Sequence, residues 1–112
     1  MKLPMSDQLT LLAVLTAIPG QEDELGRRLG ALVAPSRAEE GCLNYDLHRS
    51  NDDSAVWMLY ENWRSRADLD EHLRKPYLVS FLADQREVLA REIDISQYSM
   101  TSEVDAKFAS VA

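Results

Sequence analysis

Apolar and polar residues alternate along residues 42–49, which have the sequence CLNYDLHR. This period of two places Leu43, Tyr45 and Leu47 on one side of the chain and is typical of a half-buried β-strand. Residues 56–63 (VWMLYENW) are rich in β-branched and aromatic residues, which favours a second strand. The polar, turn-forming sequence SNDDS lies between them, so residues 42–63 are predicted to form a β-hairpin.

The register of this hairpin decides which side chains share a face of the sheet. If the strands pair about the polar turn, the face of Tyr45 also carries Leu47, Trp57, Leu59, Glu61 and Trp63. The pairing therefore predicts one carboxylate, that of Glu61, on an otherwise apolar and aromatic face. The opposite face is expected to carry Cys42, Asn44, Asp46 and His48.

Residues 9–17 (LTLLAVLTA) also predict a strand, but one that is apolar on both sides, because Leu12 and Val14 oppose the face of Leu11 and Leu15. A strand that is apolar on both faces is normally covered on both faces. A domain of this size has too few helices to cover two faces of a sheet. We therefore expect a second subunit against one of them.

A helix is predicted after the break at Pro19-Gly20, because residues 22–24 are acidic and suit a helix N-terminus. Its apolar stripe recurs at helical spacing and consists of Leu25, Leu29, Leu32 and Val33. Pro35 is expected to end or kink this helix, since proline lacks an amide hydrogen and disfavours helical backbone at the preceding residue.

A second helical region follows the hairpin. Ser65 and Asp68 fit the capped start of a short helix over residues 66–74, and Pro76 suits the first position of another. The apolar face of this last helix contains Leu78, Phe81, Leu82, Gln85 and Leu89, with one amide among the apolar side chains. Residues 93–100 are expected as a final strand. The order βαββαβ predicts a ferredoxin-like α+β fold, with helices on one face of an antiparallel sheet.

His72 is placed by this pattern on the side of its helix that faces the sheet, because it lies three residues after Leu69. We therefore expect its imidazole to approach the Glu61 carboxylate beneath the aromatic surface. Desolvation and mutual attraction would shift the pKa values of such a pair.

Composition narrows the classes of protein that fit this sequence. The 112 residues make one domain over residues 9–100, with a loose lead-in over 1–8 and a tail over 101–112. A net charge of −7 argues against nucleic-acid binding, and no apolar run reaches the ~20 residues of a membrane span. A single cysteine, Cys42, and the lack of a signal-peptide pattern favour a reducing cytoplasm. The two histidines have no ligand cluster around them, so no metal is expected.

Four pieces of the sequence, PGQEDEL, SRAEEGCLNYDLHRS, ENW and DEHLRKPY, occur in an order and at spacings that resemble the antibiotic biosynthesis monooxygenase (ABM) family. The resemblance spans residues 9–100. It is carried by Pro19, Gly20, Ser36, Arg37, Glu40, Gly41, Cys42, Tyr45, Glu61, Trp63, His72 and Pro76. It implies a homodimer of ferredoxin-like subunits that pack through their sheet faces into a dimeric α/β barrel.

The resemblance also implies an activity, because the family includes cofactor-independent monooxygenases that oxidise quinols or polycyclic phenols with dioxygen. For that reaction the candidate base is His72, oriented by Glu61, since the ordinary pKa of an imidazole, ~6.5, suits proton abstraction. Candidate contacts to an aromatic substrate are Tyr45, Trp63, Tyr77 and Phe81. Candidate donors to a developing oxyanion are Arg37, Asn44 and Gln85, although the hairpin register puts Asn44 on the other face. No cofactor is expected.

Other interpretations fit the same residues. His72 and Glu61 also suit a purely structural pair, and Trp57 and Trp63 also suit the core. The family includes haem-degrading enzymes, which use an asparagine on the first strand that residues 9–17 lack. It also includes an isomerase of a phosphorylated substrate; Arg37, Arg74 or Lys75 at the pocket mouth would favour that chemistry. A non-catalytic dimeric binding domain is the third possibility, and aromatic side chains filling the pocket would favour it.

Overall fold

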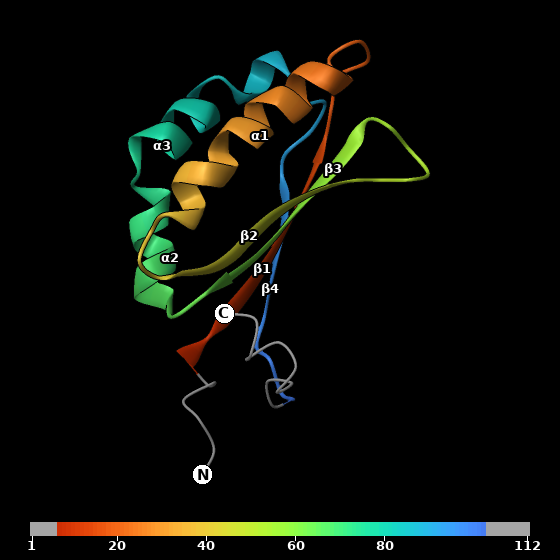
Figure 1. The fold of residues 1–112 in the computed structure, drawn as a ribbon. Helices are drawn as coiled ribbons and strands as arrows, with labels where there is room; N and C mark the ends of the chain where they lie inside the picture. Colours follow the sequence, from red (N-terminus) through yellow and green to blue (C-terminus); the bar gives the residue numbers. More distant parts are fainter. Residues whose placement is uncertain (1–6, 103–112) are drawn as a thin grey trace.

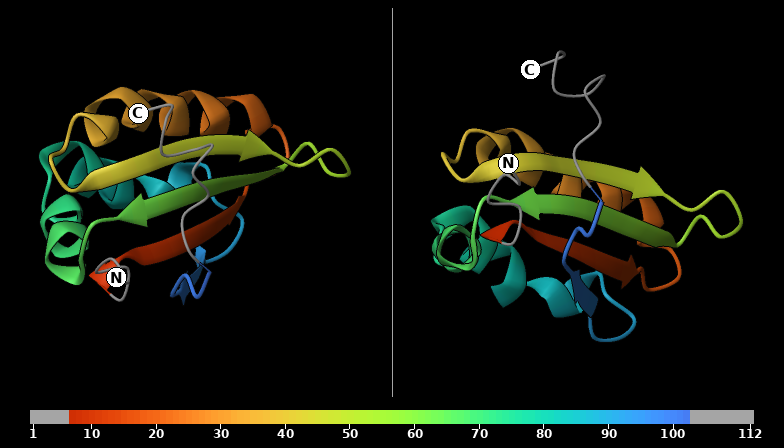
Figure 2. Two further views of the ribbon diagram at one scale, coloured as in Figure 1. Left: turned by 60° about the horizontal axis from the view of Figure 1, so that its bottom comes forward. Right: turned by 90° about the horizontal axis from the view of Figure 1, so that it is seen from below.

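A four-stranded antiparallel sheet with helices on one face forms the framework of the protein (Figure 1). We describe residues 7–102 of a computed structural model; the lead-in and tail predicted at the two ends lie mostly outside these residues. The elements are β1 (Leu9–Thr16), α1 (Glu22–Arg37), β2 (Cys42–Arg49), β3 (Val56–Trp63), α2 (Arg66–Leu73), α3 (Pro76–Ala83), the 3-10 turn η2 (Gln85–Glu87) and β4 (Asp94–Tyr98). The strand order is β2-β3-β1-β4, which confirms the ferredoxin-like prediction (Figure 2).

The core lies between the sheet and the helices. Along β1, Leu11, Ala13 and Leu15 are buried, whereas the alternate residues on the other face, Leu12 and Val14, are only partly buried. Figure 1 shows α1, α2 and α3 on the same side of the sheet. Among the described residues no helix covers the opposite face, so the apolar residues that β1 places there have only neighbouring strands as partners.

The hairpin pairs in the predicted register, with Tyr45 opposite Glu61 and Leu47 opposite Leu59. The prediction was wrong at the start of β2, where the register shifts between Cys42 and Asn44. A bulge of this kind inserts one extra residue and reverses the alternation of side chains. Cys42 therefore packs against the core, and Leu43 is exposed instead.

Helix α1 continues through Pro35 and ends at Arg37, whereas we expected the proline to end or kink it. Proline removes only its own amide from the hydrogen-bond ladder. The following turn still closes, because the Ala38 amide donates to the carbonyl oxygen of Ala34 at 3.2 Å. The Pro35 carbonyl also accepts a hydrogen bond from the Tyr77 hydroxyl at 3.3 Å, which ties α1 to α3.

Helix α3 is shorter than its apolar pattern predicted, ending at Ala83 rather than near Leu89. The chain beyond it bonds to the end of β1 instead. The Ile18 amide donates to the Val88 carbonyl at 2.8 Å, and Ala17 forms an isolated bridge with Leu89. Backbone pairing with β1 thus replaces the last helical turn while keeping Val88 and Leu89 buried.

Two glycines of α1 provide a matched test of how the helix packs on the sheet. A Cβ atom at Gly26 would lie 2.3 Å from Cζ2 of Trp57, whose Nε1 donates to the Glu22 carbonyl at 3.1 Å. A Cβ atom at Gly30 would meet nothing within 4 Å. We expect Gly26→Ala to destabilise the protein by about 1–3 kcal/mol through overpacking. We expect Gly30→Ala to stabilise it by roughly 0.5–1 kcal/mol through helix propensity.

Urea unfolding followed by tryptophan fluorescence measures both free energies of unfolding. Equal effects of the two substitutions would contradict close packing of α1 on Trp57.

Candidate functional site

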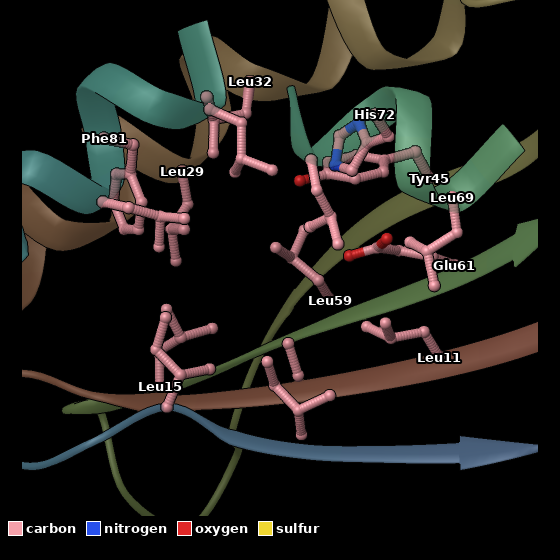
Figure 3. A pocket seen from close by; sticks show the side chains of 16 residues that line it. Leu11, Leu15, Leu29, Leu32, Tyr45, Leu59, Glu61, Leu69, His72 and Phe81 are labelled. Carbon is pink, nitrogen blue, oxygen red and sulfur yellow. The ribbon is translucent and has the colours of Figure 1, made fainter. Parts of the chain in front are cut away.

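An apolar cavity of about 80 Å³ lies between the sheet and the helices (Figure 3). Only three of the residues that line it carry polar side chains, namely Tyr45, Glu61 and His72. The others are Leu11, Ala13, Leu15, Leu29, Leu32, Leu59, Leu69, Leu73, Leu78, Phe81, Leu82, Ile93 and Ile95. Figure 3 shows the Glu61 carboxyl group, the Tyr45 hydroxyl and the His72 ring together at one end, with Leu15, Leu29 and Phe81 toward the other. The cavity therefore has a polar end and an apolar end.

Glu61 is held at the polar end by the hairpin register, which places it opposite Tyr45 on β2 and opposite Leu11 on β1. It is 4% exposed, and its Oε1 accepts a hydrogen bond from Nε1 of Trp63 at 2.9 Å. Burial raises the pKa of Glu61 to about 7, because the apolar surroundings penalise the charged form more than the Trp63 hydrogen bond favours it. The Glu61 carboxyl group can therefore gain or lose a proton near neutral pH.

His72 reaches the cavity from α2, whose start is capped by the Ser65 hydroxyl accepting from the Asp68 amide at 3.2 Å. The residue as a whole is 2% exposed. The centroid of its imidazole lies 4.5 Å from that of the Trp63 ring and 5.4 Å from that of the Tyr45 ring. These two aromatic rings limit how far the imidazole can turn.

The partner of His72 differs from the prediction. Nδ1 of His72 lies 2.8 Å from Oε2 of Glu39, not beside Glu61. Glu39 belongs to the connection between α1 and β2, and its side chain is 8% exposed. The connection lies against α2 because Gly41 has no side chain, and a Cβ atom there would be 2.1 Å from Cγ of Asp68. The sequence offered no sign of this role, since Glu39 stands beside Glu40 in a polar loop.

Of the four predicted aromatic contacts, Tyr45 and Phe81 line the cavity, whereas Trp63 and Tyr77 do not. Trp63 is fully buried behind His72, where it donates to Glu61. Tyr77 turns its hydroxyl away from the cavity and donates to Oε2 of Glu39. Trp63 and Tyr77 therefore support the polar groups rather than forming the cavity wall.

The three predicted oxyanion donors are not brought to the cavity. Arg37 lies outside, where its Nε donates to the Tyr45 carbonyl at 3.0 Å and its Nη2 to Asp46 at 2.7 Å. Asn44 lies on the face of the sheet opposite the helices, which we call the open face, as the predicted hairpin register required. Gln85 donates to the Leu82 carbonyl at 3.0 Å within the turn that ends α3.

Burial raises the pKa of the Cys42 thiol to about 11, with the carboxyl groups of Glu39 and Glu61 adding to the effect. Cys42 is therefore a neutral thiol near pH 7, which does not suit a nucleophile. Within residues 7–102, no three His, Cys, Asp or Glu side chains gather in a way that could hold a metal ion. In the same part of the chain, every helix is too short or too polar to cross a membrane.

Comparison with known proteins gives the family. The sequence profile of the antibiotic biosynthesis monooxygenase family matches residues 9–84. The chain belongs to this family. The ABM protein from Mycobacterium tuberculosis that is named "Putative monooxygenase Rv0793" is 32% identical over 102 residues, which cover 91% of this chain and 100% of that protein.

Solved structures agree with the ABM assignment. PA3566 from Pseudomonas aeruginosa has a TM-score of 0.83 and 42% sequence identity, with coverage of 88% of this chain and 98% of that one. The structure of Rv0793 has a TM-score of 0.82, with coverage of 88% and 99%. These matches span most of the chain and show the fold, whereas the family is shown by the profile match over residues 9–84.

The raised pKa of Glu61 predicts how the stability of this ABM protein depends on pH. Its ordinary pKa of 4.5 is raised to about 7 on folding, so the native state resists ionisation of Glu61. The contribution of Glu61 to the free energy of unfolding is therefore fully present below about pH 4.5 and is lost as the pH rises through 7. The substitution Glu61→Gln removes the ionisable carboxyl group and keeps a side-chain oxygen that accepts the hydrogen bond from Trp63. We expect this variant to be more stable than the wild type by up to about 3 kcal/mol at pH 8, and equal to it near pH 4.5.

Urea unfolding of both proteins between pH 4.5 and pH 8 measures this difference. The surface substitution Glu71→Gln on α2 is the control and should give no such divergence. Parallel curves for the wild type and Glu61→Gln would contradict the raised pKa.

Proposed function

We propose that this ABM protein is a cofactor-independent monooxygenase that oxidises a quinol or electron-rich phenol with dioxygen. The observation that carries the proposal is the apolar cavity with its single polar end, where the buried Glu61 carboxyl group and the buried His72 imidazole face the same space. Such a site suits a flat aromatic ring whose hydroxyl group must lose a proton.

The proposed reaction draws its electrons from the substrate. Removal of a hydroxyl proton from a hydroquinone gives an electron-rich anion, which passes one electron to dioxygen. The resulting semiquinone and superoxide combine through a new C–O bond, and the peroxide anion takes back the first proton from His72 to give a hydroperoxide. Cleavage of its O–O bond, with transfer of the ring C–H proton to His72, yields a hydroxyquinone and water. One oxygen atom of O2 enters the product and the other leaves as water.

The polar side chains divide the proton transfers between them. His72 acts as the base that takes the hydroxyl proton. Glu61, which is protonated below about pH 7, supplies a proton to the oxygen that leaves as water. Burial and the neighbouring Glu61 raise the pKa of Tyr45 well above its ordinary value, so its hydroxyl keeps its proton and donates a hydrogen bond to the substrate oxygen. The apolar wall excludes water from the radical pair.

The size of the cavity favours a substrate with one aromatic ring. Its volume of about 80 Å³ is smaller than the roughly 150 Å³ of an apolar cavity known to bind benzene, so even one ring requires some lining side chains to move. Leu73 and Ile95 line the cavity and are 48% and 54% exposed, which places them at its mouth. Their side chains are the ones free to move outward.

The alternative chemistries have less support. Among the described residues, no lysine or arginine lines the cavity, so nothing there would bind a phosphate group. Arg37 is paired with Asp46 and Arg74 with Glu71, both outside it. Filling of the cavity by Trp57, Trp63 and Phe81 would favour a non-catalytic binding domain, but of these three only Phe81 lines the cavity and space remains beside it.

Oxygen consumption with a panel of substituted hydroquinones tests the proposed reaction. We expect turnover above the enzyme-free background, with one atom of ¹⁸O2 in the product, and we expect single-ring quinols to be oxidised faster than naphthoquinols. His72→Ala should lower kcat by about 100-fold, because a positioned base contributes about that much or more. The exposed histidine provides the control, and His48→Ala should retain wild-type turnover.

Absence of turnover across the panel, or equal rates in the two histidine variants, would contradict the proposal.

We also propose that the protein is a homodimer that pairs through the open face of the sheet. Leu12 and Val14 of β1 lie beside Tyr60 and Met58 of β3 on this face, and Tyr60 is exposed. Adjacent apolar side chains of this kind gain free energy when a second subunit covers them. A second subunit on the open face would also cover Leu12 and Val14, the apolar residues that β1 places on that side.

Sedimentation should report about twice the chain mass of 12.7 kDa. Val14→Glu, which puts a charge at the centre of the open face, should shift the protein toward the monomer. Val79→Glu provides the control, because Val79 is equally apolar but exposed on α3. A monomeric wild type would contradict the dimer.

A further inference from the structure

Glu39 is a buried acid that contacts the site without lining the cavity. Its Oε2 lies 2.8 Å from Nδ1 of His72 and also accepts the hydrogen bond of the Tyr77 hydroxyl. Two donors from two different helices, α2 and α3, therefore converge on one carboxylate oxygen from a third segment, the connection between α1 and β2. A contact of this kind fixes the imidazole relative to all three segments.

The chemistry of the three groups sets the direction of each hydrogen bond. In its carboxylate form Glu39 only accepts hydrogen bonds, and in that form the Tyr77 hydroxyl and His72 Nδ1 both donate to it. Whenever the imidazole is neutral, its one proton then resides on Nδ1. The lone pair of Nε2 is left as the acceptor, and it lies on the part of the ring directed away from Glu39. Because Glu39 is outside the cavity and His72 lines it, Nε2 is the nitrogen available to a ligand.

We propose that Glu39 is a positioning residue that selects the Nδ1–H tautomer of His72 and holds its ring plane, and that Tyr77 in turn holds Glu39. The consequence for turnover rests on the proposed monooxygenase function, in which His72 is the base. The tautomer assignment does not rest on it, since it follows from the two hydrogen bonds that a Glu39 carboxylate accepts. A neutral imidazole with the proton on Nε2 would present a donor to the cavity and could not take the substrate proton.

The connection that carries Glu39 is held by contacts that do not involve the Glu39 side chain. The Glu39 amide donates to the Ser36 carbonyl at 3.1 Å, and the Cys42 amide donates to the Glu39 carbonyl at 3.1 Å. The Arg64 amide donates to the Gly41 carbonyl at 2.8 Å. Substitution of the Glu39 side chain should therefore leave the path of the backbone intact.

Nitrogen-15 NMR of the imidazole rings tests the tautomer directly. The sequence contains two histidines, and His48 is exposed on β2, so its ring serves as an internal reference in the same spectrum. With both rings neutral, we expect His72 to show a protonated Nδ1 and an unprotonated Nε2. His48, whose Nδ1 lies 3.3 Å from the Asp46 carbonyl oxygen on the surface of the sheet, should show a larger share of the Nε2–H tautomer than His72. A neutral His72 with its proton on Nε2 in the wild type would overturn the proposal, whatever the activity.

Three variants separate positioning from a merely structural role. Glu39→Gln keeps an oxygen acceptor at the same place, and Glu39→Met has a similar length but no such acceptor. Tyr77→Phe removes the second donor to Glu39 together with the hydrogen bond to the Pro35 carbonyl. We expect the methionine variant to move the His72 proton toward Nε2 and to lose about 100-fold in kcat with little change in KM. The glutamine and phenylalanine variants should keep the tautomer and most of the activity.

The outcomes distinguish the two proposals. Retention of both the Nδ1–H tautomer and wild-type kcat in Glu39→Met would overturn the role of Glu39. If the methionine variant does not fold, the wild-type and Glu39→Gln spectra still decide the tautomer. A wild type that oxidises no quinol but shows the expected spectrum would remove the monooxygenase proposal and leave the positioning of His72 in place.

Discussion

The hydrogen bond between Glu39 and His72 is the constraint on which the geometry of the site depends. Both side chains are almost fully buried, at 8% and 3% exposure. Removing such groups from water is costly unless their hydrogen bonds are well made, so their relative position tolerates little change. The bond joins α2 to the α1–β2 connection, and Tyr77 extends it to α3. One small polar cluster thus sets how three segments meet above the sheet.

The two buried acids differ in how many donors each receives. Glu39 accepts from both His72 and Tyr77, whereas Glu61 accepts from Trp63. With one neutral donor and an apolar cavity beside it, Glu61 resists ionisation, and its pKa rises to about 7. The same layer of the protein therefore contains one acid used as a hydrogen-bond acceptor and another that can exchange a proton. Membership of the ABM family gives this arrangement a chemical context.

The fold separates this polar cluster from solvent without filling the space beside it. Leucine side chains from β1, α1 and α3 form the far wall, and among the described residues Glu61 and His72 are the only acidic or basic side chains that line the cavity. The layered architecture explains why: β1 and β3 supply one apolar surface, and the helices supply the other. A cavity at such an interface favours a flat apolar ligand with a single polar edge.

Local sequence patterns were enough to predict the order of the elements and the hairpin register from Tyr45 to Leu47, because periods of two and 3.6, capping residues and turn residues act over a few neighbouring positions. They placed Tyr45, Glu61 and His72 on the inner side for the same reason. Only the tertiary structure decided the rest. The bulge that turns Cys42 inward, the close approach of Gly41 to Asp68 and the pairing of Glu39 with His72 all depend on contacts between segments far apart in the chain. No local pattern encodes such contacts, since they arise from how closely two packed backbones can approach each other.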